Sequence, residues 1–237
     1  MHGNTGVRPK MTFVEFKEMT MVSMDEICRD IFRENRHSIK IKKEETVVRN
    51  LVNIFNATLK LSNEKGFRTM TLRDLCAETG LSMGALYSYI SSKDELLDII
   101  QSQGRRITEK VLMERINSAE GPRERLSMAV HTHLYLSEVM QKWFFFSYME
   151  TKNLDRRVHG SAKEAELFTE KIFVDILIQG KEGGLFRQGD PVLTASMIKA
   201  MLQDWYLKRW KYKKRNISVE EYATNVVDMI ESYILAE

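Results

Sequence analysis

The stretch from Leu72 to Leu97 constrains the fold more than any other part of the chain. It predicts two short helices joined by a tight turn and followed at once by a longer helix. Thr71 can cap the first helix, because its hydroxyl can accept from the free N–H groups of the opening turn. Gly80 follows where the chain must leave that helix, since glycine takes a positive φ without steric cost. Ser82 can cap the second helix, and Ser92–Glu95 reads as a capping box for the third.

Two interpretations fit this pattern. The outward positions of the second helix are mostly small or flat, namely Met83, Gly84, Ala85, Tyr87 and Ser88. A short helix with small residues at its exposed N-terminus is what a DNA recognition helix requires. An ordinary corner between two helices can carry the same glycine turn and have no relation to DNA. The local pattern alone leaves both interpretations open.

A longer set of motifs favours the first interpretation. The motifs are Gly66-Phe67, Thr69-Met70-Thr71, Leu75-Cys76, Gly80-Leu81-Ser82, Gly84-Ala85-Leu86-Tyr87 and Lys93-Asp94-Glu95-Leu96-Leu97. From about Leu51 to Leu97 the chain resembles the TetR/AcrR family of bacterial transcription regulators. It departs from the family pattern at Ile90, where Phe is usual, and at Ser88, where a larger side chain is common. The resemblance implies an N-terminal three-helix DNA-binding domain and a C-terminal helical bundle for ligand binding and dimerisation.

Length and composition agree with an all-α chain of two domains. The 237 residues are 43% hydrophobic, which is enough for a domain of roughly 50 residues and a larger one. Alternating β-type runs with turn dipeptides are nearly absent. We expect a partly helical or disordered leader over 1–39, a helix-turn-helix domain over 40–100, and a ligand-binding and dimerisation domain over 101–237. The leader contains two capping boxes, starting at Thr12 and Ser23, and is expected to pack on its own subunit or the partner, or to touch DNA as an arm.

Charge and cysteine content restrict the partners and the compartment. The net charge of +3 is too small to identify a nucleic-acid-binding protein by itself. Between Lys40 and Lys93, however, nine Lys and Arg residues stand against five Asp and Glu, a local net charge of +4. Two cysteines are too few for a disulfide framework. No apolar run approaches the roughly 20 residues of a membrane span, so we expect a cytoplasmic protein with no membrane partner.

The DNA contacts expected from the motif fall into two groups. For base contacts we predict Ser82, Met83, Gly84, Ala85 and Ser88, none of which can bond guanine or adenine in a bidentate manner. For contacts near the phosphate backbone we predict Thr71, Arg73, Tyr87, Tyr89, Lys93, Lys42 and Lys43. The two tyrosines are included because the family resemblance implies that their hydroxyls reach phosphates; as an alternative they are core aromatics. The lysines at 42 and 43 can also be a solvated helix entry.

Lys93 is the most informative residue of the second group. A lysine in the first turn of a helix is electrostatically unfavourable, because that end of the helix dipole is positive. A phosphate bridging the helix N-terminus and the ammonium would remove the conflict, and the family has its usual lysine at this position. The alternative is an ordinary exposed first-turn lysine.

The densest aromatic stretch, Trp143–Met149, has two interpretations. It is either core packing or the wall of an apolar ligand cavity, with Glu150 as one of the few polar groups that orient the ligand. The residues predicted to bind ligand are Trp143, Phe146, Met149, Glu150, Phe173 and Trp205. The basic segment Lys208–Arg215 would suit an anionic ligand such as an acyl-CoA, which part of the resembled family senses. A second nucleic-acid site there is less favoured.

The resemblance also implies the assembly. In the family, the last two long helices of each subunit form a four-helix dimer interface. For this interface we predict Met197, Met201, Tyr222, Val226 and Ile230. The helix from Lys93 to about Ala119 is expected to serve both domains, as a mechanical link between ligand and DNA.

An enzyme is not expected. The sequence contains no glycine-rich phosphate loop, no nucleophile elbow and no Cys/His cluster at metal spacing, so we expect no metal and no other cofactor. Two hypotheses are left. The first is a ligand-responsive DNA-binding regulator, a repressor released from a near-palindromic double-stranded operator by a small apolar or acyl-CoA-like effector. The second is a dimeric helical ligand-binding or interaction protein that does not bind DNA. The absence of acidic residues from Ser82 to Lys93 favours the first.

Overall fold

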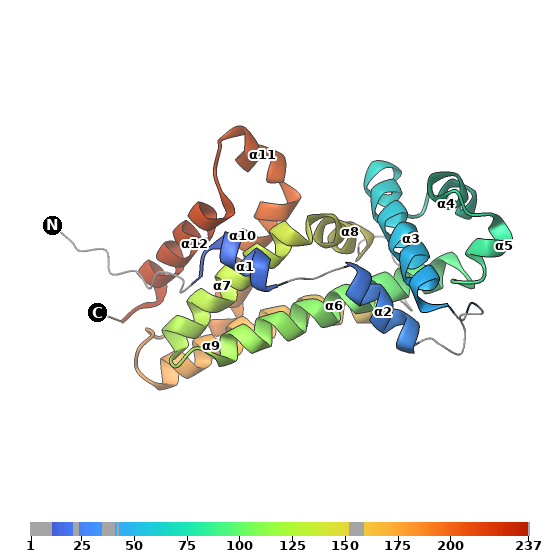
Figure 1. Cartoon of the computed structure of the whole chain (residues 1–237). Helices are drawn as coiled ribbons and strands as arrows, with labels where there is room; N and C mark the ends of the chain where they lie inside the picture. Colours follow the sequence, from blue (N-terminus) through green and yellow to red (C-terminus); the bar gives the residue numbers. More distant parts are fainter. Residues whose placement is uncertain (1–10, 21–23, 35–40, 42, 152–158, 237) are drawn as a thin grey trace. The chain divides into compact units, whose positions relative to one another are not determined.

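The chain folds into helices. A computed structural model describes residues 11–20, 24–34, 41, 43–151 and 159–236, and in these ranges every regular element is a helix (Figure 1). The helices are α1 (Phe13–Met19), α2 (Met24–Glu34), α3 (Glu44–Lys65), α4 (Leu72–Thr79), α5 (Met83–Leu86), α6 (Lys93–Asn117), α7 (Pro122–Val139), α8 (Gln141–Thr151), α9 (His159–Glu182), α10 (Pro191–Leu207), α11 (Arg209–Lys214) and α12 (Val219–Ile234). The all-α prediction is confirmed.

The helices form two compact units. The helix-turn-helix unit comprises Met21–Ile107 and Lys142–His159. The bundle unit comprises Met1–Thr20, Thr108–Gln141 and Gly160–Glu237. This division differs from the predicted one in two ways: α8 belongs to the helix-turn-helix unit, and the leader is shared between the units. Helix α6 contributes to both units.

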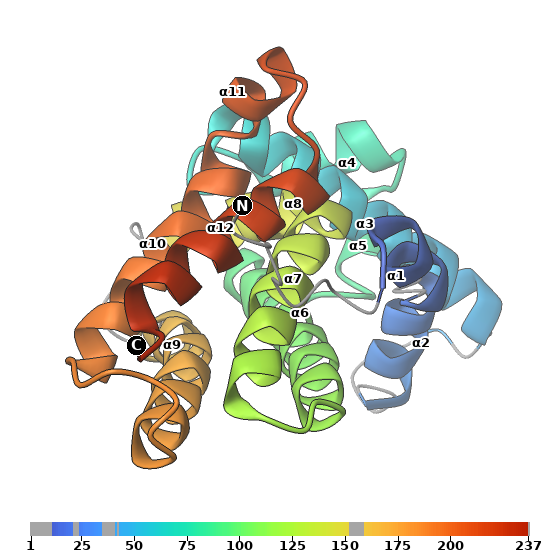
Figure 2. The same ribbon diagram turned by 90° about the vertical axis from the view of Figure 1, so that its left-hand side faces the viewer.

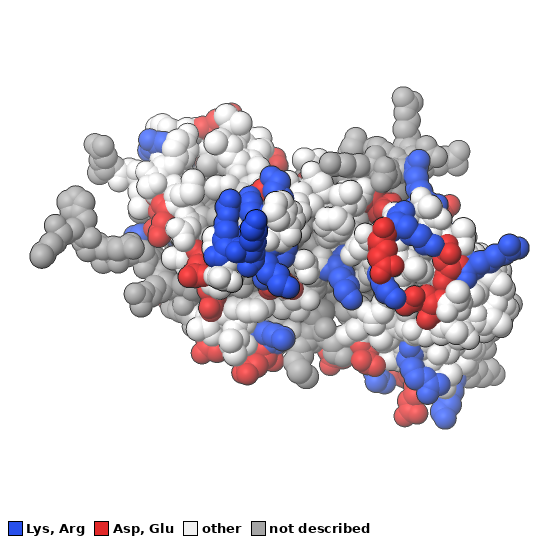
Figure 3. Space-filling view, turned by 90° about the horizontal axis from the view of Figure 1, so that it is seen from above, with Lys and Arg blue, Asp and Glu red and all other residues white. Residues whose placement is uncertain are grey.

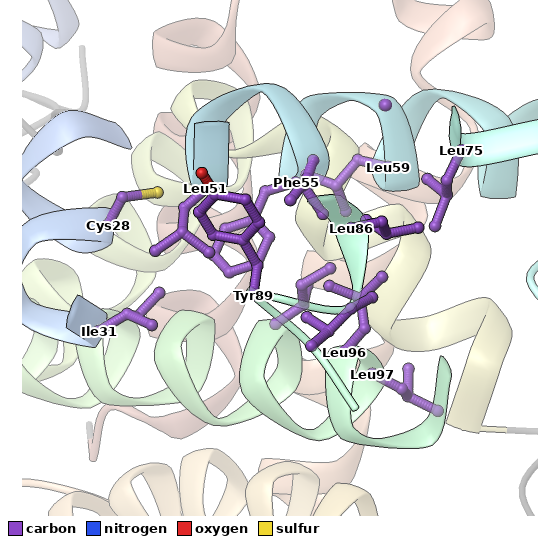
Figure 4. Close-up of a cluster of buried hydrophobic side chains, with 14 of the residues drawn as sticks. Cys28, Ile31, Leu51, Phe55, Leu59, Leu75, Leu86, Tyr89, Leu96 and Leu97 are labelled. Carbon is purple, nitrogen blue, oxygen red and sulfur yellow. The ribbon is translucent and has the colours of Figure 1, made fainter. Parts of the chain in front are cut away.

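One apolar core holds the helix-turn-helix unit together. Buried side chains from α2 to α6 meet in it, including Cys28, Ile31, Leu51, Phe55, Leu59, Leu75, Leu86, Tyr89, Leu96 and Leu97 (Figure 4). In α3 the buried residues Leu51, Phe55 and Leu59 recur every four positions, the spacing that places apolar side chains on one helix face. Because these side chains are almost fully buried, the core fixes how α4 and α5 are presented.

The leader is part of both folded units. Thr12 caps α1 with Glu15 as predicted, and Phe16 is 1% exposed where α1 packs on α7. In the other unit, α2 packs on α3, and Glu34 of α2 pairs with Arg106 of α6. The described leader helices therefore pack on their own chain. The predicted cap Ser23 lies outside the described residues, as does the predicted disorder before Met11.

The bundle unit is built around α7. The residues from Leu126 to Ser137 are nearly all buried, and α1, α10 and α12 pack against this helix. Helices α10 and α12 lie side by side (Figure 2), and the hydroxyl of Tyr222 donates to the carbonyl of Met201 at 2.7 Å. The chain breaks at Lys208, between α10 and α11. The break lets the ring of Tyr212 stack on Trp205 with centroids 5.0 Å apart.

Candidate DNA-binding surface

Local capping interactions set the start of α4. The hydroxyl of Thr71 accepts from Asp74 N at 3.1 Å, and the Asp74 carboxylate accepts from Thr71 N at 2.7 Å, which is the predicted cap in its reciprocal form. Lys65 at the end of α3 lies 2.8 Å from Asp74 Oδ1. The hydrogen bond from Lys65, followed by those from Thr71, lowers the pKa of the Asp74 carboxyl to about 2. The cap thus also joins α3 to α4.

The turn into α5 follows the predicted chemistry. Gly80 has φ +73°, a left-handed conformation that residues with a Cβ rarely adopt. The hydroxyl of Ser82 accepts from Ala85 N at 3.2 Å and so caps α5. Cys76 Sγ of α4 lies 3.3 Å from Met83 Sδ of α5. These contacts hold the two helices of the motif in one arrangement.

The second helix of the motif is shorter than predicted. It runs only from Met83 to Leu86 and continues as a tighter turn, in which Ser88 N donates to Ala85 O and Tyr89 N donates to Leu86 O. Leu86 is fully buried and anchors the turn in the core. The short element therefore presents one turn of backbone with little side-chain bulk.

The predicted base-contact residues share one accessible surface. Ser82, Met83 and Gly84 are exposed, and Ala85 and Ser88 are half-buried. Tyr87, predicted near phosphate, is 48% exposed at the edge of the same segment. The hydroxyl of Ser88 already donates to the carbonyl of Gly84 at 3.1 Å. We refer to residues 82–88 as the recognition surface.

The side chain of Tyr89 points into the core rather than toward the recognition surface. It is 6% exposed and packs in the core (Figure 4), where its hydroxyl accepts from Asn50 Nδ2 at 2.6 Å. The hydroxyl accepts this bond and keeps its own hydrogen, so a phosphate contact by Tyr89 stays a prediction. The core alternative, also open from the sequence, is therefore the one that the structure favours.

Lys93 has protein partners for all three of its ammonium protons. Its Nζ donates to the carbonyl oxygens of Phe67 at 2.7 Å, Arg68 at 2.9 Å and Met70 at 2.8 Å. Burial lowers the pKa of this lysine. An ammonium has only three N–H donors, so Lys93 fastens the turn before α4. The prediction that it binds phosphate remains a prediction, and it now requires exchange of one of these bonds.

The remaining predicted contacts lie at the surface or outside the described residues. Thr71 and Arg73 at the start of α4 are exposed, as is Lys43 at the start of α3. Lys42 lies outside the described residues. The predicted capping box of α6 is only partly formed. Ser92 Oγ accepts from Glu95 N at 3.0 Å, while the Glu95 carboxylate accepts from the Ser91 hydroxyl at 2.7 Å.

Comparison with known proteins identifies the family. Residues 54–100 match the model of bacterial regulatory proteins of the tetR family. Residues 119–234 match the tetracyclin repressor-like C-terminal domain. Together the two models match more than half of the chain. The chain belongs to the TetR family of bacterial transcriptional regulators. It is thus a regulator with a helix-turn-helix DNA-binding domain, as the resemblance implied.

Relatives and solved structures agree with this membership. The chain is 26% identical over 186 residues to the transcriptional regulator HbdR of Aromatoleum sp. (strain CIB), covering 78% of this chain and 80% of HbdR. It is 28% identical over 163 residues to the repressor KstR2 of Mycobacterium tuberculosis, covering 62% and 74%. The structure of KstR2 superposes with a TM-score of 0.72 at 19% identity, covering 84% and 99%. AibR, solved with isovaleryl coenzyme A and operator DNA, gives 0.68 at 21% identity, covering 76% and 97%.

In this TetR-family chain, α8 packs inside the helix-turn-helix unit. Phe146 is 1% exposed and meets the ring of Phe67 edge to face at 5.9 Å. Glu150 is 3% exposed, and its carboxylate accepts from Phe67 N at 3.2 Å. Trp143 Nε1 donates to Ile100 O at 3.0 Å. The Trp143 ring also occupies the space at Gly104, where a Cβ would lie only 1.9 Å from it. These contacts fill the unit that binds DNA.

The residues predicted to bind ligand therefore lie in two different units. Trp143, Phe146 and Glu150 have packing partners in the helix-turn-helix unit, and Met149 is 40% exposed. Phe173 and Trp205 are buried in the bundle unit. The six residues thus lie in two units, and their part in ligand binding stays a prediction. The apolar run of α8 carries little sign of which core it joins, because apolar residues surround the helix.

Ion pairs neutralise part of the positive charge of the basic segment Lys208–Arg215. Arg209 pairs with Glu138, and both Lys208 and Lys211 pair with Asp204. Lys and Arg side chains gather over α11 on the face shown in Figure 3. Trp205 and Tyr212 are buried, whereas Trp210 is 69% exposed. Trp205 is thus a packing residue, with its indole N–H donating to Glu138 at 3.1 Å.

The predicted dimer residues are of two kinds. Met197 is 60% exposed, and Met201 and Tyr222 are half-buried. Val226 and Ile230 are only 3% and 4% exposed, so their own chain already covers them. The packing of α12 on α7 leaves these two residues little surface for a partner subunit, and their place in the dimer interface stays a prediction. The exposed apolar residues that the sequence analysis missed are Val192, Leu193, Met229 and Tyr233. The four-residue spacing of Met229 and Tyr233 was the available signal.

In the described ranges, no group of three or more His, Cys, Asp or Glu side chains is placed to hold a metal ion. Among the helices of those ranges, none combines the length and apolar character that a membrane crossing needs.

Proposed function

We propose that this regulator is a homodimeric repressor, without catalytic activity, that binds a near-palindromic operator in the bacterial cytoplasm. Two recognition surfaces would enter successive major grooves, about 34–36 Å apart, as in other helix-turn-helix dimers. A small-molecule effector bound in the bundle unit would favour a state whose spacing no longer fits the operator. The observation that carries the proposal is the surface of residues 82–88.

The recognition surface has the shape and charge that a groove requires. It combines exposed small residues with a core anchor at Leu86, and the sequence from Ser82 to Lys93 contains no acidic residue. An acidic side chain there would be repelled by phosphates, whereas a surface unrelated to DNA has no reason to exclude one.

We assign the expected DNA contacts according to the solvent exposure of each side chain. Ser82, Met83, Gly84, Ala85 and Ser88 would face bases, with Ala85 or Met83 against a thymine methyl group. Thr71, Arg73, Tyr87 and Lys43 are exposed and would meet phosphates. We keep Lys42 in the same group from its position in the sequence. Lys93 and Tyr89 would act as positioning residues, since their polar atoms hold the turn before α4 and the helix α3.

The dimer would form through α10 and α12. Val192, Leu193 and Met197 of α10 and Met229 and Tyr233 of α12 are each more than half exposed. Exposed apolar side chains grouped on neighbouring helices are typical of a protein–protein contact. The resemblance of the chain to a family that dimerises through its last two long helices supports the same assignment.

The effector would act through α6. This helix contributes its first part to the helix-turn-helix unit and its last part to the bundle unit, so both units share one continuous backbone. A coupling free energy of about 1–3 kcal/mol would weaken operator binding roughly 5- to 150-fold. The complex of AibR with isovaleryl coenzyme A and operator DNA supports an acyl-CoA-like or other small apolar effector.

Selection of bound DNA from a random duplex pool tests the proposal. We expect a near-palindromic sequence to be enriched, with binding that weakens steeply as salt rises. A protein that enriches no sequence at low ionic strength, or that is monomeric in solution, would overturn the proposal and leave the helical interaction protein as its replacement.

A further inference from the structure

Two buried polar groups on α7 lack partners in the fold. His131 and Tyr135 are each 2% exposed, and their rings lie one helical turn apart with centroids 5.8 Å from each other. Neither His131 Nε2 nor the Tyr135 hydroxyl has a hydrogen-bond partner in the described structure. Buried side-chain polar atoms are nearly always satisfied, because leaving one unpaired costs free energy. Two such atoms one helical turn apart on α7 mark a candidate site for a polar group.

The hydrogen-bonding character of His131 and Tyr135 determines which chemical group could bind both side chains. His131 Nδ1 lies 2.8 Å from the carbonyl oxygen of Ser127, which can only accept, so the ring hydrogen is on Nδ1. Burial lowers the pKa of His131, which keeps the ring neutral and leaves a lone pair on Nε2. Burial raises the pKa of Tyr135, so its hydroxyl keeps a proton to donate.

One group can satisfy both atoms. A hydroxyl can donate to Nε2 and at the same time accept from the tyrosine. A carboxylate can only accept and would face the Nε2 lone pair, so it is disfavoured. The two unpaired atoms therefore favour a ligand with a neutral hydroxyl group over a ligand with a carboxylate.

Aromatic side chains of the leader line the same place. The rings of Phe13 and Phe16 of α1 meet the ring of Tyr135 edge to face, with centroids 5.4 Å and 5.3 Å away. Phe16 is 1% exposed. The carboxylate of Glu220 on α12 accepts from Phe13 N at 2.6 Å, a bond that also fastens α1. We call His131, Tyr135, Phe13 and Phe16 the α1–α7 site.

We propose that the α1–α7 site binds the hydroxyl group of a small apolar ligand, with the rings of α1 as its cover. The hydroxyl donates to His131 Nε2 and accepts from Tyr135. That this ligand is the effector rests on the proposed function; its binding does not require DNA. The proposal gives the leader a role, since α1 supplies half of the site.

Phenol and toluene are suitable probes, because they have similar size and differ in one hydroxyl. We expect phenol to raise the thermal midpoint of the full chain in a concentration-dependent manner, and toluene to do so much less. His131→Leu and Tyr135→Phe should each weaken phenol binding at least about tenfold in calorimetric titration. Thr224→Val, which removes an exposed hydroxyl in the same unit, is the control and should bind phenol like the parent. Equal effects of phenol and toluene, or full phenol binding by both site variants, would overturn the proposal.

A measurement without ligand separates this site from a structural water. If the tyrosine hydroxyl serves only a ligand, Tyr135→Phe should melt at the same temperature as the parent chain or higher, because no hydrogen bond is lost. A lower midpoint would show that a buried water satisfies the pair as part of the fold, and the proposal would fall. A chain that binds phenol as expected but selects no DNA would contradict the proposed function and leave this site intact.

Discussion

Lys93 Nζ lies 2.7 Å from the carbonyl oxygen of Phe67 and 4.8 Å from the centroid of the Phe67 ring. One lysine thus holds both the backbone and the side chain of the residue that leads into α4. From α8, the Glu150 carboxylate accepts the N–H of the same residue. The turn between α3 and α4 is therefore fastened from two helices distant in sequence.

Replacing Lys93 by Met should destabilise the helix-turn-helix unit. The variant keeps the aliphatic stem but removes three charge-assisted hydrogen bonds to carbonyls. We expect a loss on the order of 1–3 kcal/mol in the free energy of unfolding, measured by urea denaturation. The slope of log affinity against log salt should stay unchanged, because the ammonium is occupied by protein. A slope reduced by about 0.9 would instead show a lost phosphate contact.

Glu150→Ala should weaken the same turn from its other side. It leaves the buried N–H of Phe67 without an acceptor, which typically costs about 1–3 kcal/mol. Urea denaturation and operator affinity, measured together, should both decrease. Lys142→Ala, an exposed change on the same helix, is the control. If the two variants unfold alike, Glu150 does not hold the turn.

The Lys65–Asp74 pair predicts that the stability of the folded chain decreases at acidic pH. The pKa of Asp74 is about 2 in the folded chain, against about 3.9 for an unfolded aspartate. The unfolded state therefore binds the proton first as the pH falls. The stabilisation is complete above about pH 4 and is lost as the pH falls toward 2. Asp74→Asn should remove this part of the acid loss in a denaturation series, whereas Asp25→Asn on α2 should follow the parent.

The proposed dimer surface predicts a change of assembly. Met197→Glu and Met229→Glu place a charge among exposed apolar side chains and should shift the protein from dimer to monomer in sedimentation experiments. Met113→Glu, at a position of α6 that is 38% exposed, should remain dimeric. Dimers that persist in both interface variants would place the contact elsewhere.

The recognition surface predicts an effect on binding without an effect on folding. Ala85→Glu puts a carboxylate where bases and phosphates are expected, and should weaken operator binding at least about 100-fold. Ala77→Glu, on the exposed side of α4, should have a much smaller effect. Fluorescence anisotropy with the selected operator gives both affinities. Equal losses in the two variants would remove Ala85 from the contact surface.

Short-range features of this protein were determined by the sequence alone. The caps at Thr12, Thr71 and Ser82 and the left-handed turn at Gly80 all lie where the residue types predicted them. Each depends on atoms within about four residues, so the local chain contains the whole cause. The helix α3 also has a local cause, because apolar residues recur on one of its faces along its 22 positions.

The tertiary structure alone decided which side of each apolar helix is covered, and by what. Tyr89 and Tyr87 are two residues apart and of the same type, yet one is 6% and the other 48% exposed. Val226 and Met229 both suit an interface, and only the packing of α12 on α7 separates them. The aromatic run of α8 joined the DNA-binding core for the same reason. Burial of an apolar side chain is favourable against any apolar surface, because the hydrophobic effect is not directional. The surface that covers each helix face is therefore determined only by the packing of the whole chain.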